Sequence, residues 1–436
     1  MKFYSTRDTN HLVDFEQAVF QSLPADGGLY MPREIPALDP AVLSQLSSMS
    51  FTDIALAVSS RLLGDAIPPE VLSRIVTEAI NFPAPVVKLS EGAYVLELFH
   101  GPSMAFKDFG ARFMSRVMAY FLEKRERDLH ILVATSGDTG GAVAMGFYQV
   151  PHIHVTILYP SGKVSPIQEK QLTTLGENIT ALEVEGTFDD CQRLVKQAFL
   201  DEDLNRRLNL SSANSINISR LIPQSFYYLQ AVAQLARMGD SRPAVFSVPS
   251  GNFGNLTAGL FAERMGMPCH GFVASTNVND EVPRYLDTGI FTPRPSLHTL
   301  SNAMDVGNPS NFQRMEALFS HDVHRMADRI SGYSFTDEQT REAIRSVFGD
   351  TGYIMCPHTA VAWLGLKRYL RDHPGSGVAP VFLSTAHPCK FEEVYDQDMR
   401  SRLVYPDQVK AFGAREKRAT RIGPDYDRLK KLLEAY

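Results

Sequence analysis

The stretch His100-Gly-Pro-Ser-Met-Ala-Phe-Lys107-Asp-Phe-Gly-Ala-Arg-Phe113 decides how the chain is interpreted. It follows an apolar run typical of a strand (94–99) and opens a pattern of helical spacing (105–121). A lysine flanked by phenylalanines at such a junction is expected to be shielded from water. Desolvation lowers the pKa of a lysine ammonium, and the resulting amine can form a Schiff base with an aldehyde. The alternative is a lysine that pairs with Asp108 and keeps its ammonium in water.

Composition and charge exclude several functional classes. The chain has 436 residues, of which 44% are hydrophobic and 21% charged, with a net charge of −6. It lacks the basic stripe of a nucleic-acid-binding protein and the run of about 18 apolar residues that a membrane span needs. Four widely spaced cysteines without a C-x-x-C pair predict reduced thiols rather than zinc or disulfides. The first residues lack the apolar core of a signal peptide, so we expect a cytoplasmic protein that binds neither nucleic acid nor membrane.

The hydrophobic pattern changes at Pro83-Ala-Pro85, where proline blocks continuation of the preceding helix. Before this point, residues around 40–63 and 70–79 show the apolar spacing of helices. After it, short apolar runs alternate with helical patterns, which predicts βα units and parallel sheets flanked by helices. The predicted strands are His130–Ala134, His152–Leu158, Ile179–Val184, Val245–Val248, Cys269–Ala274 and Ala379–Leu383.

Two glycine-rich loops follow predicted strands, which is where open α/β sheets bind ligands. Thr135-Ser-Gly-Asp-Thr-Gly-Gly141 can offer hydroxyls and amides to an anion, or can simply cap the next helix. Ser250-Gly-Asn-Phe-Gly-Asn255 precedes a predicted helix (256–265), and its successive amides suit a phosphate. This second loop matches neither the P-loop nor the dinucleotide fingerprint, and a tight turn is its other interpretation.

A third loop, Leu383-Ser-Thr-Ala-His-Pro-Cys-Lys-Phe391, again follows a predicted strand and carries hydroxyls and His387. Alone it is a weak signal, because a single histidine in a loop is more often a packing residue. A lysine that captures an aldehyde and a loop that holds a phosphate have one economical explanation together. Pyridoxal 5′-phosphate (PLP) carries both groups.

Six motifs, in order along the whole chain, resemble the threonine synthase family in its longer class with an extra N-terminal domain. They are His100–Phe109, Thr135–Gly140, Asn214–Arg220, Val248–Gly254, Asn302–Gly307 and Thr385–Pro388.

The resemblance implies an α/β fold of the fold-type II PLP enzymes, similar to the tryptophan synthase β subunit. Such a fold has two open, mostly parallel sheets flanked by helices, plus an N-terminal domain, here 1–84. The catalytic region would span 85–436, with a small subdomain at roughly 126–215 inserted in a large PLP-binding domain, 85–125 and 216–436.

The implied activity is the last step of threonine biosynthesis, in which a PLP-dependent lyase converts O-phospho-L-homoserine and water to L-threonine and phosphate. By resemblance, Lys107 is catalytic and forms the Schiff base with PLP, and Thr385 hydrogen-bonds the ring nitrogen. The cofactor phosphate would be held by Ser250, Gly251, Asn252, Phe253, Gly254 and Asn255. Asp138 would lie beside the 3′-oxygen, where related enzymes often carry Asn. A carboxylate there repels a phenolate unless it is protonated or turned away.

The substrate would be bound by Thr135, Ser136 and Thr139 on one side, and by Asn214, Ser215, Asn217 and Arg220 on the other. The latter group resembles the family's substrate-phosphate pocket, in which the arginine fork matches phosphate geometry. The Asn302–Gly307 motif matches the family without suggesting a chemical role.

Other readings of the same motifs remain open. A phospho-lyase or a serine/threonine dehydratase on the same scaffold needs only that elimination outrun water addition. A PLP-binding protein without turnover would keep the same motifs. A nucleotide-binding protein built on the glycine-rich loops would lack a visible chromophore. We expect no metal, and a monomer or homodimer.

Overall fold

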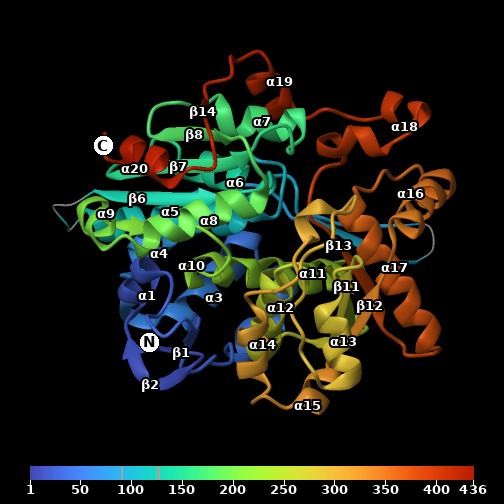
Figure 1. Cartoon of the computed structure of the whole chain (residues 1–436). Coiled ribbons are helices and arrows are strands. Elements are labelled where there is room, and N and C mark those ends of the chain that lie inside the picture. The colour runs from blue at the N-terminus through green and yellow to red at the C-terminus, as the bar shows by residue number, and fades with distance from the viewer. Residues whose placement is uncertain (90–91, 124, 126–127) are drawn as a thin grey trace.

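The computed structural model describes residues 1–89, 92–123, 125 and 128–436, which form three sheets (Figure 1). The strand orders are β2-β1-β3, β12-β11-β10-β13-β5-β4 and β14-β8-β7-β6-β9. The two larger sheets carry the loops of interest.

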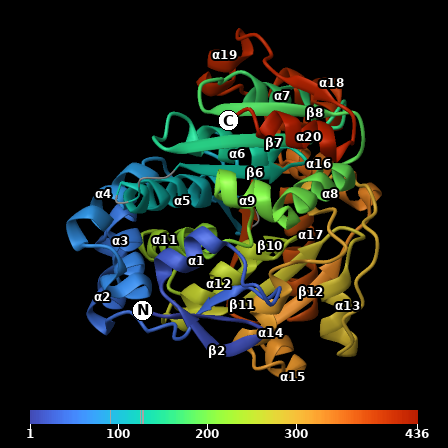
Figure 2. The same ribbon diagram turned by 60° about the vertical axis from the view of Figure 1, so that its left-hand side comes forward.

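The N-terminal unit combines the small antiparallel sheet with helices. Its elements are β1 (Phe3–Ser5), β2 (Asp8–Val13), α1 (Phe15–Gln21), β3 (Tyr30–Pro32), α2 (Pro40–Gln45), η1 (Leu46–Ser48), α3 (Phe51–Leu63), η2 (Gly64–Ala66) and α4 (Pro69–Ala79). Capping boxes at Asp14 and Ser50 explain where α1 and α3 begin. Helix α4 packs on α5 (Lys107–Leu122) and α3 on α11 (Phe226–Arg237), as Figure 2 shows. Apolar side chains of this unit and the catalytic region therefore share one continuous core.

The six-stranded sheet forms the centre of the large domain. Its strands are β4 (Val86–Lys88), β5 (Tyr94–Glu97), β10 (Ala244–Pro249), β11 (Cys269–Thr276), β12 (Ile330–Ser334) and β13 (Ala379–Ser384). All neighbours pair in parallel except β4, which runs antiparallel to β5. Strands β10 and β13 are buried along their whole length, as expected of parallel strands covered on both faces. Helix α17 (Pro357–Asp372) packs across β10, β11 and β13.

The five-stranded sheet is parallel throughout. Its strands are β6 (Leu129–Ala134), β7 (Ile153–Pro160), β8 (Ile179–Val184), β9 (Leu210–Ser211) and β14 (Thr420–Ile422). Helices α6 (Asp138–Phe147), α7 (Pro166–Thr173), α8 (Phe188–Leu200) and α20 (Tyr426–Leu433) accompany it. The sequence prediction assigned everything after residue 216 to the large domain. In the structure, the C-terminal segment adds β14 to the five-stranded sheet, where it pairs with β8, and Figure 1 shows α20 beside the same sheet.

The other helices connect these layers. They are α9 (Glu202–Leu208), α10 (Ile218–Leu221), η3 (Ile222–Ser225), α12 (Gly254–Arg264), α13 (Glu281–Thr288), η4 (Asn302–Met304), α14 (Phe312–Leu318), α15 (Val323–Ala327), α16 (Asp337–Thr351), η5 (Pro388–Val394), α18 (Gln397–Ser401) and α19 (Asp407–Gly413). In the part of the chain that is described, we find no helix long and apolar enough to cross a membrane.

The predicted architecture is confirmed: two open, mostly parallel sheets flanked by helices, with an N-terminal unit. Each of the seven predicted strands, including the run 94–99 (β5), is present, with ends within two residues of those expected. The glycine-rich loops follow β6 and β10, and Thr385 follows β13, so all three leave the carboxyl ends of parallel strands. This is the edge at which open α/β sheets bind their ligands.

Candidate active site

Lys107 is the first residue of α5 and lines a large cavity. The loop before it is tied to the loop after β13, because the Phe106 amide donates to the Thr385 carbonyl (2.9 Å) and the His387 amide to the Met104 carbonyl (3.0 Å). Asp108, the alternative partner of Lys107, instead accepts a hydrogen bond from the Ser103 amide (2.8 Å).

The Lys107 amine makes no hydrogen bond or ion pair with the described residues. Burial lowers its pKa from 10.5 to about 8; the charges of Arg220 and Lys390 add to this effect, and that of Asp138 opposes it. The amine is therefore available to react with an aldehyde near neutral pH.

The Ser250–Asn255 loop forms a cradle at the start of α12. Phe253 has a left-handed backbone (φ 59°), which turns the chain from β10 into the helix. Among the described residues, none of the amides of 251–255 donates to another group of the chain. These amides and the positive end of α12 are suited to a phosphate. Two hydroxyls, of Tyr227 and Tyr228, donate to Asn255 Oδ1 (2.7 Å each), and Asn255 Nδ2 is left as a buried donor without a partner.

The Thr135 loop turns into α6. Thr135 Oγ1 accepts from the amides of Gly137 (3.0 Å) and Gly140 (2.8 Å), so this hydroxyl shapes the loop. Ser136, Asp138 and Thr139 also line the cavity. Asp138 is buried and pairs with Lys390 Nζ (2.6 Å). Although burial alone would raise the pKa of the Asp138 carboxyl, the charges of Lys390 and Lys107 hold it well below its usual value.

Arg220, on α10, is buried beside the cavity. It donates from Nη1 to the Ala213 carbonyl, while its Nε has no partner among the described residues. Burial lowers the pKa of Arg220 to about 10, which leaves the guanidinium charged at neutral pH. Asn214 and Ser215 also line the cavity. Asn252 Nδ2 donates to Ser215 Oγ (3.2 Å), so the Asn214–Arg220 loop abuts the Ser250–Asn255 cradle.

Every predicted site residue lines this one cavity of about 2100 Å³ except Asn217. The Asn217 amide nitrogen donates to the Val19 carbonyl (2.7 Å) and to Ser22 Oγ (2.8 Å), and its oxygen caps α10. Its side chain is therefore committed to the N-terminal unit, and the structure does not place it with the substrate-binding group.

Three residues at or beside the cavity were not predicted from the sequence: His358, which lines it, and Lys390 and Arg314, which do not. Lys390 lay inside the quoted third loop, and its signal was the uncompensated acid Asp138. His358, at the start of α17, accepts from the Ala303 amide (3.2 Å). Arg314, on α14, is fully buried and donates to the carbonyls of Tyr30 (3.1 Å) and Ile216 (2.6 Å) and to Asn311 Oδ1 (2.7 Å). No pattern in the sequence distinguished these two residues.

The Asn302–Gly307 motif, which had no explanation in the sequence, packs on the cradle. A Cβ at Gly251 would lie 2.6 Å from Met304 Cα, so only glycine allows η4 to approach the loop this closely. Asn302 to Gly307 also line the cavity. The motif therefore forms the outer wall of the cradle.

Comparisons with known proteins agree with this geometry. The sequence profile described as "Pyridoxal-phosphate dependent enzyme" matches residues 77–384, "Threonine synthase N terminus" matches 2–80, and "Threonine synthase, C-terminal" matches 359–433. Threonine synthase from Escherichia coli strain K12 is 43% identical over 99% of both chains.

The chain belongs to the threonine synthase family.

Solved threonine synthase structures extend the likeness to the fold. That from Escherichia coli superposes with a TM-score of 0.90 over 100% of both chains. The yeast enzyme, at 31% identity, gives a TM-score of 0.93 over 99% of this chain and 98% of the other. A PLP-bound threonine synthase from Brucella melitensis, at 33% identity, gives 0.92 over 100% and 99%.

The residues of this threonine synthase family member fit the cofactor of the family, PLP. The partner-free Lys107 amine suits the aldehyde, and the acceptor-free amides of 251–255 and the free Asn255 Nδ2 suit the phosphate. The Thr385 hydroxyl lines the cavity and has no hydrogen bond to the described residues, so it is available to a ring nitrogen. The predicted cofactor is confirmed at the level of the family.

Proposed function

We propose that the chain converts O-phospho-L-homoserine and water to L-threonine and phosphate. The observation that carries the proposal is the presence of two anion sites around one free lysine. The Ser250–Asn255 cradle suits the cofactor phosphate, and Arg220 with its unpaired Nε supplies a second site in the same cavity. A dehydratase acting on serine or threonine needs only the first site.

Lys107 is assigned the proton transfers. When bound, PLP supplies an aldehyde for the Lys107 amine and a conjugated ring that takes up the electron pair of a broken Cα–H bond. Once the substrate amine has replaced it, the Lys107 amine accepts and returns protons at Cα and Cβ. Its lowered pKa, about 8, lets it act in both directions near neutral pH.

Arg220, Asn214 and Ser215 are assigned to the phosphate ester. The substrate bond that breaks is Cγ–O, and the departing phosphate takes both electrons. A guanidinium at this point stabilises the developing charge, and cavity burial strengthens the interaction. Cγ takes up a proton and becomes the methyl group of threonine, while Cβ loses one proton and gains the hydroxyl group of water. The remaining proton of water leaves with the phosphate. Ser136 and Thr139, with Thr135 shaping their loop, are assigned to the substrate carboxylate.

A product assay tests the proposal. Purified protein loaded with PLP is given O-phospho-L-homoserine, and released phosphate and amino acid are both measured. Equal amounts of phosphate and threonine are expected. Phosphate with a keto acid and ammonia would instead identify a phospho-lyase, and no phosphate would reject the substrate. Lys107→Ala is expected to lose the visible absorbance of bound PLP and the activity. Lys163→Ala removes another lysine that lines the cavity and should keep both.

We also infer a cytoplasmic enzyme that acts as a monomer or homodimer. Cys191, Cys269, Cys356 and Cys389 are all free, which fits a reducing compartment. Sedimentation velocity of the loaded enzyme distinguishes the two oligomeric states.

A further inference from the structure

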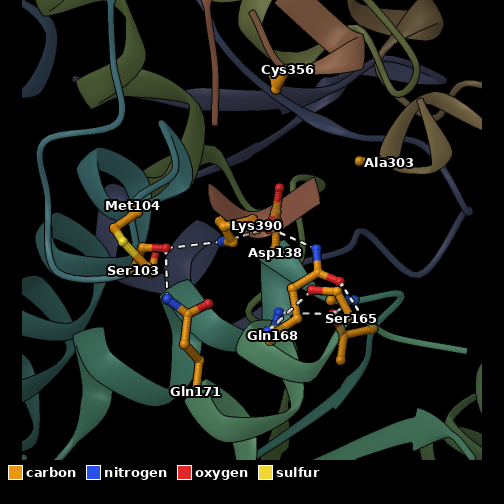
Figure 3. A network of polar contacts seen from close by, with 12 residues as sticks. Ser103, Met104, Asp138, Ser165, Gln168, Gln171, Ala303, Cys356 and Lys390 are labelled. Atoms are coloured by element: carbon orange, nitrogen blue, oxygen red, sulfur yellow. Dashed lines mark hydrogen bonds and ion pairs between the residues drawn. The ribbon is translucent and has the colours of Figure 1, made fainter. Parts of the chain in front are cut away.

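A buried ion pair lies beside the reacting lysine. Lys390, on η5, has a fully buried side chain whose Nζ is 2.6 Å from Asp138 Oδ1 and donates to the Ser103 carbonyl (2.9 Å). Gln168, on α7, donates to the same Asp138 oxygen (3.0 Å). Figure 3 shows Asp138 held between Lys390 and Gln168, with Ser103 on the far side of Lys390.

The second oxygen of Asp138 is in a different situation. Within the described residues, Oδ2 takes part in no hydrogen bond or ion pair, and Asp138 lines the cavity that contains Lys107. One carboxylate oxygen is thus saturated by Lys390 and Gln168, while the other stays available. An ion pair that served only to join α6 to η5 would not need to expose an oxygen to the cavity.

The local backbone is built to hold this arrangement. Gly137, which precedes Asp138, has φ +136°, a conformation that other residues rarely adopt. A Cβ at Gly137 would collide with the Gln168 side chain, so the glycine lets Gln168 reach over Asp138. A capping box at Ser165 in turn fixes the start of α7 and the position of Gln168.

The charged and titratable groups around the pair come from several helices. The Asp138 carboxylate interacts electrostatically with Lys107 on α5, with His358 on α17 and with the Cys356 thiol that precedes α17. The charge of Lys390 also lowers the pKa of the Asp108 carboxyl, and the charge of Arg220 on α10 lowers the pKa of Lys107. Asp138 is the acidic group that acts on Lys107, against two cations, Arg220 and Lys390.

We propose that Asp138 is the counter-ion of the Lys107 nitrogen, and that Lys390 is a positioning residue that keeps Asp138 aimed at the cavity. The Asp138–Lys390 pair has no net charge. The ammonium of Lys390 therefore offsets the repulsion that a carboxylate alone would exert on the 3′-oxygen of the cofactor. The inference depends on the assignment of Lys107 in the proposed function, but not on the identity of the substrate.

The test uses the full chain freed of cofactor and follows capture of added PLP by the growth of visible absorbance. Only the unprotonated Lys107 amine reacts, so the capture rate plotted against pH gives the protonation midpoint of that amine. The wild-type midpoint is expected at about 8. Asp138→Asn should lower it by about one pH unit, because the ammonium loses its counter-ion. Lys390→Met should raise it by about the same amount, because a repelling cation is lost.

The double variant D138N/K390M removes both charges and should return within about half a pH unit of wild type. Lys430→Met breaks an ion pair of the same length, with Asp201, which does not line the cavity, and should leave the midpoint unchanged. Asp138→Asn preserves the shape of the side chain, so it remains informative if Lys390→Met fails to fold.

Wild-type midpoints in both single variants, with lower melting temperatures, would show a purely structural pair and overturn the inference. Shifts in the opposite directions would overturn it as well. If the midpoints move as expected while the product assay yields no threonine, the proposed reaction fails and the inference stands. If Lys107→Ala still captures PLP, the assignment of Lys107 fails first.

Discussion

Arg220 is a buried arginine that forms no ion pair among the described residues, so its charge is available to a ligand. We predict that Arg220→Lys raises the KM for O-phospho-L-homoserine about 10- to 100-fold, because an ammonium cannot form the bidentate contact of a guanidinium with phosphate. PLP affinity should change little, since the cradle is intact. Steady-state kinetics and cofactor titration measure the two effects separately.

A matched control is Arg112→Lys. Arg112 is also buried, but its guanidinium donates to the carbonyls of Glu78 and Ala79 and to Asn81, away from the cavity. This variant should lose stability and keep its KM. Equal changes of KM in both variants would remove Arg220 from the phosphate site.

At the scale of elements, the sequence predicted strands and loops correctly where the signal is local, as in an apolar run that ends at a polar loop. Short apolar runs followed by glycine-rich loops identified β6 and β10, and a run followed by a hydroxyl-rich loop identified β13. These three loops supply much of the predicted cavity lining. It missed the strands of two or three residues, such as β9 and β14, because so few residues carry no periodic signal. Contacts between distant segments were equally invisible. The Asp138–Lys390 pair depends on the approach of α6 and η5 in the fold, and only the family resemblance indicated that their loops meet.

The contact between η4 and the cradle can be tested at Gly251. We predict that Gly251→Ala weakens PLP binding at least about 10-fold, because the added methyl lies 2.6 Å from Met304 Cα and must displace η4 or the loop. Equilibrium dialysis or visible titration with PLP measures the loss.

Gly349→Ala provides the control. Gly349 lies inside α16, where an added Cβ meets no atom within 4 Å. This change should leave PLP affinity unchanged and stabilise the protein by about 0.5–1 kcal/mol, since alanine favours the helix. Unchanged PLP affinity in Gly251→Ala would mean that η4 can yield without disturbing the cradle.

At the scale of the whole molecule, the N-terminal unit accepts hydrogen bonds that hold the Asn214–Arg220 loop in place. The sequence showed no residue in it with a chemical role, because the contacts it makes with the site, through the Tyr30 and Val19 carbonyls and the Ser22 hydroxyl, have no sequence signature. Arg314 donates to the carbonyls of Tyr30 and Ile216, and Asn217 donates to the Val19 carbonyl, so the middle of the Asn214–Arg220 loop is tied to this unit. The two parts also share one continuous apolar core.

Asn217→Ala tests this support. We predict a loss of about 1–3 kcal/mol in the free energy of unfolding, because two buried acceptors lose their donor and α10 loses its cap. The KM should rise only modestly, through the loosened Asn214–Arg220 loop. Urea unfolding and kinetics are measured on the same preparations. A large rise of KM without loss of stability would return Asn217 to direct contact with the substrate.

Acid stability depends in part on three buried histidines, His130, His358 and His387. Burial, assisted by His154, lowers the pKa of His130 from 6.5 to about 4, and burial lowers the pKa values of His358 and His387 to about 4. Each group binds a proton more readily in the unfolded chain, so its contribution to stability is complete above pH 6.5 and is lost as the pH falls toward 4. Asp108 and Asp305, whose pKa values burial raises to about 6, act in the opposite direction. A variant is therefore needed to separate the histidine contribution.

His130 is suited to this test because it lies on β6, outside the cavity lining, and contacts Thr156 Oγ1 (2.8 Å). We predict that His130→Gln is less stable than wild type at about pH 7.5, but that the difference shrinks at about pH 5, because only wild type must there keep a buried imidazole unprotonated. Urea midpoints of both proteins at the two pH values measure the effect, and the contributions of the other titrating groups cancel in the comparison. A difference that stays constant with pH would mean that His130 is protonated as readily in the fold as in the unfolded chain.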